Sequence, residues 1–127
     1  MPVTMVHIVE KNQIVATWTN PVIQADFAEA FAFVAPLYTR AKSPIHTIYV
    51  ASGLNGLPPN ALSTYLRNPD SPLRHAMAGI FVVVADNTFI RMIVETAAKL
   101  ARAKAVYVAP SLEEAEALVA EKATNTA

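Results

Sequence analysis

Residues 79–85 read Gly-Ile-Phe-Val-Val-Val-Ala, the clearest strand in the chain. The run is apolar on both faces, which is typical of a central strand covered on both sides. Asp86 and Asn87 follow as a helix start, and apolar residues then recur with helical spacing from Phe89 to Ala101. A buried strand that leads into an amphipathic helix favours an α/β fold with a parallel sheet.

The alternation of strands and helices continues on both sides of this unit. Strands are predicted over 5–9, 13–18, 45–51 and 105–109, a hairpin turn over 10–12, and helices that begin at Asp26, Asn60 and Ser111. Pro36 lies inside the first helix and predicts a kink or an early end near Ala32. The order β-β-α-β-α-β-α-β-α predicts a mostly parallel sheet of about five strands, with helices mainly on one face.

Composition limits the class of protein. A chain of 127 residues predicts one domain over 1–127, with an ordered core of about 5–121. Ten basic and ten acidic residues cancel, which argues against a nucleic-acid partner. There is no cysteine, no recognisable signal peptide and no apolar run of the ~18 residues that span a bilayer. We therefore expect a soluble cytoplasmic protein without a membrane span.

Two segments carry a resemblance to a known family. One is GIFVVVAD at 79–86, which leads into a helix, and the other is AVYVAPSLEEAEALVAE at 105–121. Together with the strand and helix order, they resemble the SpoIIAA-like family. This family includes the STAS domains of sulfate transporters and anti-sigma factor antagonists. The resemblance implies a single SpoIIAA-like domain and a regulatory role exerted through protein contacts.

The turn after the third strand departs from that family. The antagonists carry an Asp-Ser-Ser-Gly type motif there, whose serine is phosphorylated by a partner kinase. Here Val50 stands at the acidic position of the strand, and Pro58-Pro59-Asn60 stands at the serine-bearing turn. Ser63 lies about one helical turn further on. The resemblance therefore implies the scaffold without the phospho-switch.

No motif points to catalysis, a metal or a cofactor. Val50 and Leu54 stand where a G-x-S-x-G nucleophile elbow around Ser52 needs glycines. The three histidines, His7, His46 and His75, have no metal-ligand spacing. There is no glycine-rich phosphate loop either. We expect a non-enzymatic protein with no cofactor.

An apolar surplus leaves two functional hypotheses open. The leading one is a non-catalytic STAS-like module that acts through a protein partner or as a homodimer. Its contacts are expected on the helix from Asp26 and in the loop 52–60. The alternative is a binder of a small apolar ligand or lipid, with a pocket between sheet and helices lined by Phe33, Met77, Phe89 and Met92. The contact residues predicted for the two together are Ser52, Asn55, Asn60, Ser63, Phe33, Met77, Phe89 and Met92.

Overall fold

The computed structural model describes residues 3–103 and 105–125. These residues form strands and helices in the predicted order, and a short 3-10 helix, η1 (Val9–Lys11), lies in the first hairpin. The elements are β1 (Val3–Ile8), β2 (Gln13–Trp18), α1 (Gln24–Arg40), β3 (Ile45–Val50), α2 (Ala61–Arg67), β4 (Ala78–Val84), α3 (Thr88–Leu100), β5 (Val106–Ala109) and α4 (Leu112–Asn125). The predicted α/β class is thereby confirmed.

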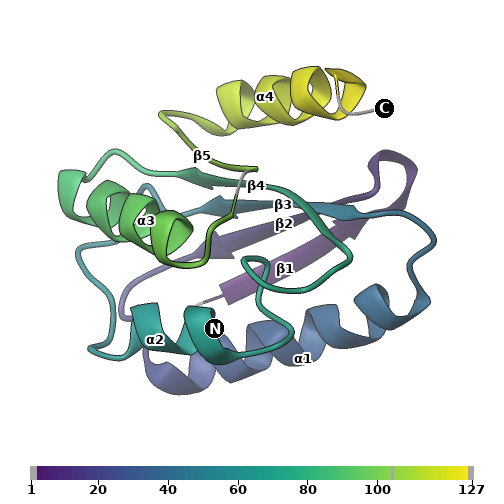
Figure 1. Cartoon of the computed structure of the whole chain (residues 1–127). Coiled ribbons are helices and arrows are strands. Elements are labelled where there is room, and N and C mark those ends of the chain that lie inside the picture. Colours follow the sequence, from purple (N-terminus) through teal and green to yellow (C-terminus); the bar gives the residue numbers. More distant parts are fainter. Residues whose placement is uncertain (1–2, 104, 126–127) are drawn as a thin grey trace.

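The sheet has five strands in the order β1-β2-β3-β4-β5. β1 is antiparallel to β2, and each later strand is parallel to its neighbour. Figure 1 shows α1, α2 and α3 on one face of the sheet and α4 on the other. This agrees with the prediction of a mostly parallel sheet with helices mainly on one face. Within the described residues, no helix is both long enough and apolar enough to cross a membrane.

The first helix differs from the prediction at both ends. α1 begins at Gln24, and Asp26 lies in its first turn, where its carboxylate accepts a hydrogen bond of 2.8 Å from the Ile23 amide. Asp26 therefore satisfies the amide that precedes the helix, rather than standing at the cap position itself. The predicted shortening at Pro36 is wrong, because α1 continues to Arg40. The Arg40 side chain donates to the Pro36 carbonyl, which supports this last turn.

The other helix starts follow the sequence more closely. Asn87 caps α3 by accepting a 2.7 Å hydrogen bond from the Phe89 amide, and Ser111 accepts one of 3.2 Å from the Glu114 amide. Asn60 stands at the N-cap position of α2, but its side chain makes no capping hydrogen bond. Its carbonyl instead accepts from the Thr64 amide. The predicted side-chain cap at Asn60 is therefore wrong.

Each face of the sheet has its own core. The face under α1–α3 is rich in aromatic side chains, among them Trp18, Phe27, Tyr49, Tyr65 and Phe81. The face under α4 is built from aliphatic residues of β3 and β4 packed against the small side chains of α4. Large rings on one side leave room for irregular packing, whereas small branched residues on the other allow α4 to lie close to the sheet. The candidate site described below lies on the aromatic side.

A bulge near the start of β4 fixes the register of the central strands. Ile45 pairs with Ala78 and Thr47 pairs with Phe81, so the register shifts at His46. His46 Nδ1 accepts a 3.0 Å hydrogen bond from the Ile80 amide. Gly79 lies against the ring, since a Cβ on it would stand 2.5 Å from that same nitrogen. Glycine at position 79 leaves space for the His46 ring, and a neutral His46 can accept the hydrogen bond from the Ile80 amide.

Candidate ligand cavity

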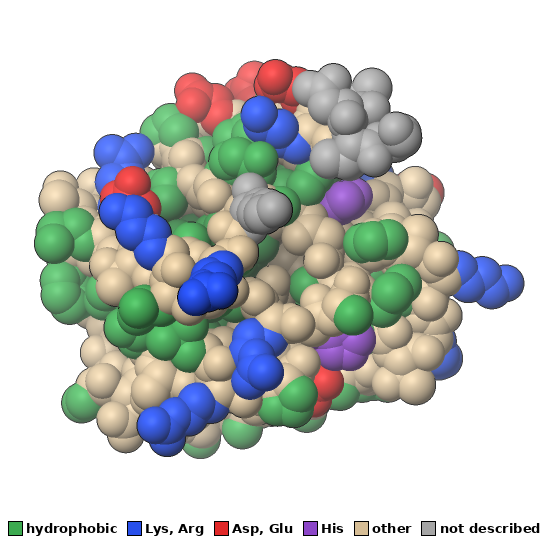
Figure 2. All heavy atoms as spheres, in the orientation of Figure 1, with side chains coloured by type: hydrophobic (Ala, Val, Ile, Leu, Met, Phe, Trp, Pro, Cys, Tyr) green, Lys and Arg blue, Asp and Glu red, His purple; other side chains and the backbone are tan. Residues whose placement is uncertain are grey.

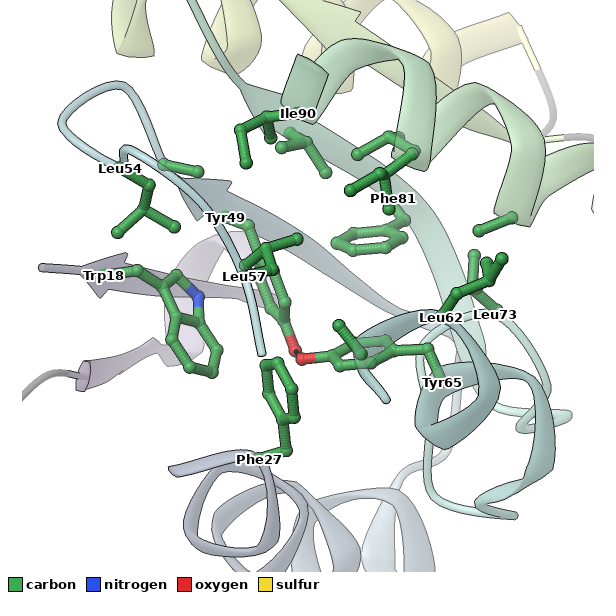
Figure 3. Close-up of a pocket in the computed structure, with 16 residues that line it drawn as sticks. Trp18, Phe27, Tyr49, Leu54, Leu57, Leu62, Tyr65, Leu73, Phe81 and Ile90 are labelled. Carbon is green, nitrogen blue, oxygen red and sulfur yellow. Dashed lines mark hydrogen bonds between the residues drawn. The ribbon is translucent and has the colours of Figure 1, made fainter. Parts of the chain in front are cut away.

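An apolar cavity lies between the sheet and the helices α2 and α3 (Figure 3). Its volume is about 80 Å³. A single water needs only ~10–15 Å³ of such space. None of the lining side chains carries a charge; they are Trp18, Phe27, Tyr49, Ala51, Leu54, Leu57, Ala61, Leu62, Tyr65, Leu73, Phe81, Val83, Ile90, Ile93, Val94 and Ala97.

Neighbouring parallel strands supply the floor of this cavity. Tyr49 of β3 lies beside Val83 of β4 in the register, and both side chains point to the same face of the sheet. Trp18, at the end of β2, packs on Tyr49 with ring centroids 5.3 Å apart. Phe81 meets Tyr49 edge to face at 4.8 Å. These tilted contacts fix the aromatic floor in one arrangement.

The helices α2 and α3 form the roof of the cavity. The helices place small side chains at two lining positions, Ala61 in α2 and Ala97 in α3. Larger side chains at these points would occupy the space between helix and sheet. Leu57, Leu62, Leu73 and Ile93 complete the lining and are only half-buried. The cavity therefore borders the surface on this side.

The loop between β3 and α2 closes one end of the cavity. The Asn20 side chain holds the loop from both directions, because it donates to the Gly53 carbonyl at 2.6 Å and accepts from the Asn55 amide at 3.0 Å. The Leu54 amide also donates to the Ala51 carbonyl at 3.1 Å. These bonds keep Leu54 buried against Trp18 and Ile90 (Figure 3). The loop is thus a positioned wall of the cavity.

Three of the aromatic residues that line the cavity carry polar atoms. The hydroxyls of Tyr49 and Tyr65 share a buried hydrogen bond of 2.8 Å, in which either oxygen can be the donor. Trp18 Nε1 is buried and has no hydrogen-bond partner. In Figure 3 this nitrogen lies on the edge of the indole ring that faces Leu57 and Tyr49. The surface of the cavity is nevertheless hydrocarbon, and these buried polar atoms lie behind it.

Burial keeps both tyrosines of this pair in their protonated form. Desolvation raises the pKa of Tyr49 well above 10.0, although its hydrogen bond with Tyr65 acts in the opposite direction. Desolvation raises the pKa of Tyr65 as well, and the nearby Tyr49 adds to this effect. Both hydroxyls are consequently neutral at physiological pH.

The four apolar residues predicted to line a pocket do not line this cavity. Phe33 is exposed on the outer side of α1. Met77 packs in a separate cluster with Tyr38 and Ile45. Phe89 and Met92 lie on α3 with 54% and 60% of their surfaces exposed. A pocket between sheet and helices is present, but other residues form it. Phe33, Phe89 and Met92 occupy exposed positions of their helices, and Met77, in the turn before β4, packs into another cluster.

The polar residues predicted as contacts lie around the loop and α2. Ser52 follows β3 and is half-buried, and Asn55 is exposed at the loop tip. Asn60 and Ser63 lie together, since the Ser63 hydroxyl donates to the Asn60 carbonyl at 3.2 Å. Both line a shallow polar depression with Gln24, Thr64, Arg67 and Asn68. The structure thus brings Asn60 and Ser63 together, outside the apolar cavity.

His46 and Ser52 lie at opposite ends of β3. His46 is the second residue of β3, whereas Ser52 comes after the end of that strand. His75 stacks on Tyr38, with ring centroids 4.4 Å apart, and its Nδ1 accepts from the Met77 amide at 2.9 Å. Among residues 3–103 and 105–125, no group of three or more acidic or histidine side chains is arranged to hold a metal ion.

The residues that define the cavity were not singled out by the sequence as site residues. Trp18, Tyr49 and Tyr65 come from three separate elements, and each reads locally as an ordinary core aromatic. The available signal was the alternation in β3 and β4, which places Tyr49 and Phe81 on one face of the sheet.

Comparisons with known proteins gave no match. No protein-family model fits the chain, and no similar protein was found among curated sequences or solved structures.

Proposed function

We propose that this protein is a non-catalytic binding module that holds a small apolar ligand in the cavity between the sheet and α2/α3. The observation that carries the proposal is the cavity itself, about 80 Å³ with an uncharged lining. Apolar cavities of this kind stay dry and take up small hydrocarbons or xenon, because filling them restores the contacts that the walls lack.

The edge of the cavity favours entry from the α2/α3 side. Figure 2 shows hydrophobic side chains over α2 and α3, bordered by Lys and Arg side chains. The half-buried leucines at positions 57, 62 and 73 form the rim. A ligand larger than the cavity extends between these side chains, whose rotamers adapt at little cost.

Binding of toluene to the full chain tests this proposal. Trp18 is the single tryptophan and lines the cavity, so its fluorescence reports occupancy directly. Toluene should change the Trp18 emission saturably and raise the unfolding temperature. Ala97→Leu fills the space and should abolish both effects, whereas Ala117→Leu, on the exposed face of α4, should preserve them. Equal binding by both variants would place the toluene elsewhere and contradict the proposal.

A second proposal is the STAS-like module that acts through protein contacts, here self-association. Phe89, Met92 and Leu100 share one helical face of α3 and are 54%, 60% and 60% exposed. An exposed apolar stripe of this kind favours contact with a second copy of the chain. A cytoplasmic location is part of the same proposal, and the lack of cysteine favours it.

Sedimentation equilibrium tests the second proposal. The full chain should dimerise, and Met92→Glu should shift it to monomer. Ala117→Glu, which adds the same charge to the exposed face of α4, should leave the dimer intact. A wild-type protein that stays monomeric at high concentration would exclude self-association.

A further inference from the structure

The two edges of the sheet differ in how well they are covered. β5, at one edge, has four residues and packs against α3 and α4, and the Lys122 ammonium lies 5.3 Å from the centre of the Tyr107 ring. β1, at the other edge, has six residues that pair with β2 in one unbroken register. Within residues 3–103 and 105–125, no strand pairs with the outer side of β1. β1 is therefore the longer and more open edge.

The sequence of β1 lacks the features that usually block an open edge. Natural edge strands are very short or carry a charged residue, a proline or a bulge, because a free row of amides and carbonyls pairs readily with another strand. Residues 3–8 read Val-Thr-Met-Val-His-Ile, with no lysine, arginine, acidic residue, proline or glycine. Their pairing with β2 contains no bulge. A second extended strand is the partner whose amides and carbonyls match this row.

A row of apolar side chains crosses the sheet and ends at the same edge. On the α4 face, Val82, Ile48, Val15 and Val6 lie side by side in the registers of β4, β3, β2 and β1. Val82 and Ile48 are fully buried and Val15 is half-buried, but Val6 keeps 50% of its surface exposed. α4 packs on β3, β4 and β5, on the side of the sheet away from β1 (Figure 1). A further apolar side chain beside Val6 would continue the row.

We propose that two copies of the chain pair through β1, in antiparallel orientation and with their Val6 side chains opposite each other. In this register Thr4 lies opposite Ile8 of the second copy and Met5 lies opposite His7, so each pair shares one face of the sheet. The valine row then runs through both copies, and no lysine, arginine or acidic side chain meets another, since β1 has none. β1 is thus complementary to itself, as a two-fold dimer requires.

This contact goes beyond the two proposed functions, because it uses neither the cavity nor the exposed stripe of α3. Val6 lies on the α4 face of the sheet, whereas the cavity lies on the other face. A contact of six residues from each copy is small, so the pairing through β1 is weak and reversible. It adds to any stronger contact that the copies make through α3.

Disulfide trapping tests the pairing, because the chain has no cysteine of its own. Opposing Cα atoms of antiparallel strands lie about 4.5–5.5 Å apart, within the range that a disulfide spans. Under mild oxidation, Val6→Cys should form a covalent dimer at least about tenfold faster than Val9→Cys. Val9 is the matched control, since it follows β1 and is 72% exposed, so random collisions favour it over Val6. An equal or faster rate for Val9→Cys would overturn the proposal.

Two further variants test the register and the independence of this contact. In an equimolar mixture, Thr4→Cys and Ile8→Cys should link to each other in preference to themselves, and a merely statistical share of mixed dimers would overturn the antiparallel register. Trapping of Val6→Cys should persist when Met92→Glu is added, because Met92 lies on α3. Loss of trapping in that double variant would show that the copies meet through α3, and would overturn a separate contact at β1.

Discussion

Replacing Tyr65 with phenylalanine removes one hydroxyl from the buried pair and leaves the other without a partner. The two oxygens lie 2.8 Å apart, and both tyrosines are buried in the aromatic core. The phenyl ring of the new side chain keeps the edge-to-face contact with Phe27, whose centroid lies 5.2 Å away. The change therefore probes the hydrogen bond rather than the packing.

The size of the effect follows from the buried hydroxyl that remains without a partner. A buried donor that loses its partner costs about 1–3 kcal/mol. Each single variant, Tyr49→Phe or Tyr65→Phe, should therefore lower the free energy of unfolding by about 1–2 kcal/mol. The double variant leaves no phenol unpaired, so its loss should be smaller than the sum of the two, with a coupling energy of about 1–2 kcal/mol.

The wild type, the two single variants and the double variant form a double-mutant cycle. Urea unfolding, followed by Trp18 fluorescence and by circular dichroism, measures the stability of each of these four proteins. Tyr107→Phe is the matched control, because Tyr107 is half-buried on β5 and does not belong to the pair. It should change stability by less than about 0.5 kcal/mol. Additive losses in the double variant would refute the reasoning, since they would show that the two hydroxyls do not depend on each other.

Three further predictions concern the fold around the cavity. Gly79→Ala should destabilise the protein by about 1–3 kcal/mol in urea unfolding, because its Cβ would stand 2.5 Å from His46 Nδ1; His46→Ala in the same background should recover part of that loss, and no recovery would contradict the proposed clash. Burial lowers the pKa of His46 below 6.5. The contribution of His46 to stability should therefore be complete above pH 6.5 and decline as the pH falls towards the lowered pKa. His46→Asn should reduce this decline, and a variant with the same pH profile of stability as the wild type would contradict the prediction. Burial raises the pKa of Tyr38 to about 12, so its contribution should be present below pH 10 and be lost as the pH rises towards 12; in absorbance at alkaline pH, Tyr38→Phe should remove a tyrosine ionisation near pH 12, and removal of one near pH 10 instead would contradict this.

The order of the elements could be predicted because each strand and helix carries its own local pattern. The run 79–85 is apolar on both faces because both faces are covered, as β4 shows in the structure. Asn87 and Ser111 cap the helices that their side chains predict. The start of α1 was misplaced by two residues, because the carboxylate of Asp26 reaches back to the Ile23 amide from inside the helix. The predicted helix end at Pro36 was wrong: α1 continues to Arg40, whose side chain donates to the Pro36 carbonyl.

The site was harder to predict because it depends on packing between distant segments. The 2.8 Å bond between Tyr49 and Tyr65 joins a strand to a helix across the cavity wall. The empty space results from alanines at 61 and 97 facing large rings, and single residues do not reveal such a combination. Phe89 and Met92 looked like lining residues from their apolar character alone. Their positions on α3 turn them to the surface instead.

The most direct test of the central claim is the crystal structure of the full chain under xenon pressure. Xenon prefers dry apolar space and needs no hydrogen bond, so it reports the cavity independently of the ligand class. We predict a xenon atom enclosed by Tyr49, Leu57 and Ile93, and its loss in Ala97→Leu. A structure of the pressurised wild-type crystal in which side chains fill this region and no xenon lies there would contradict the account.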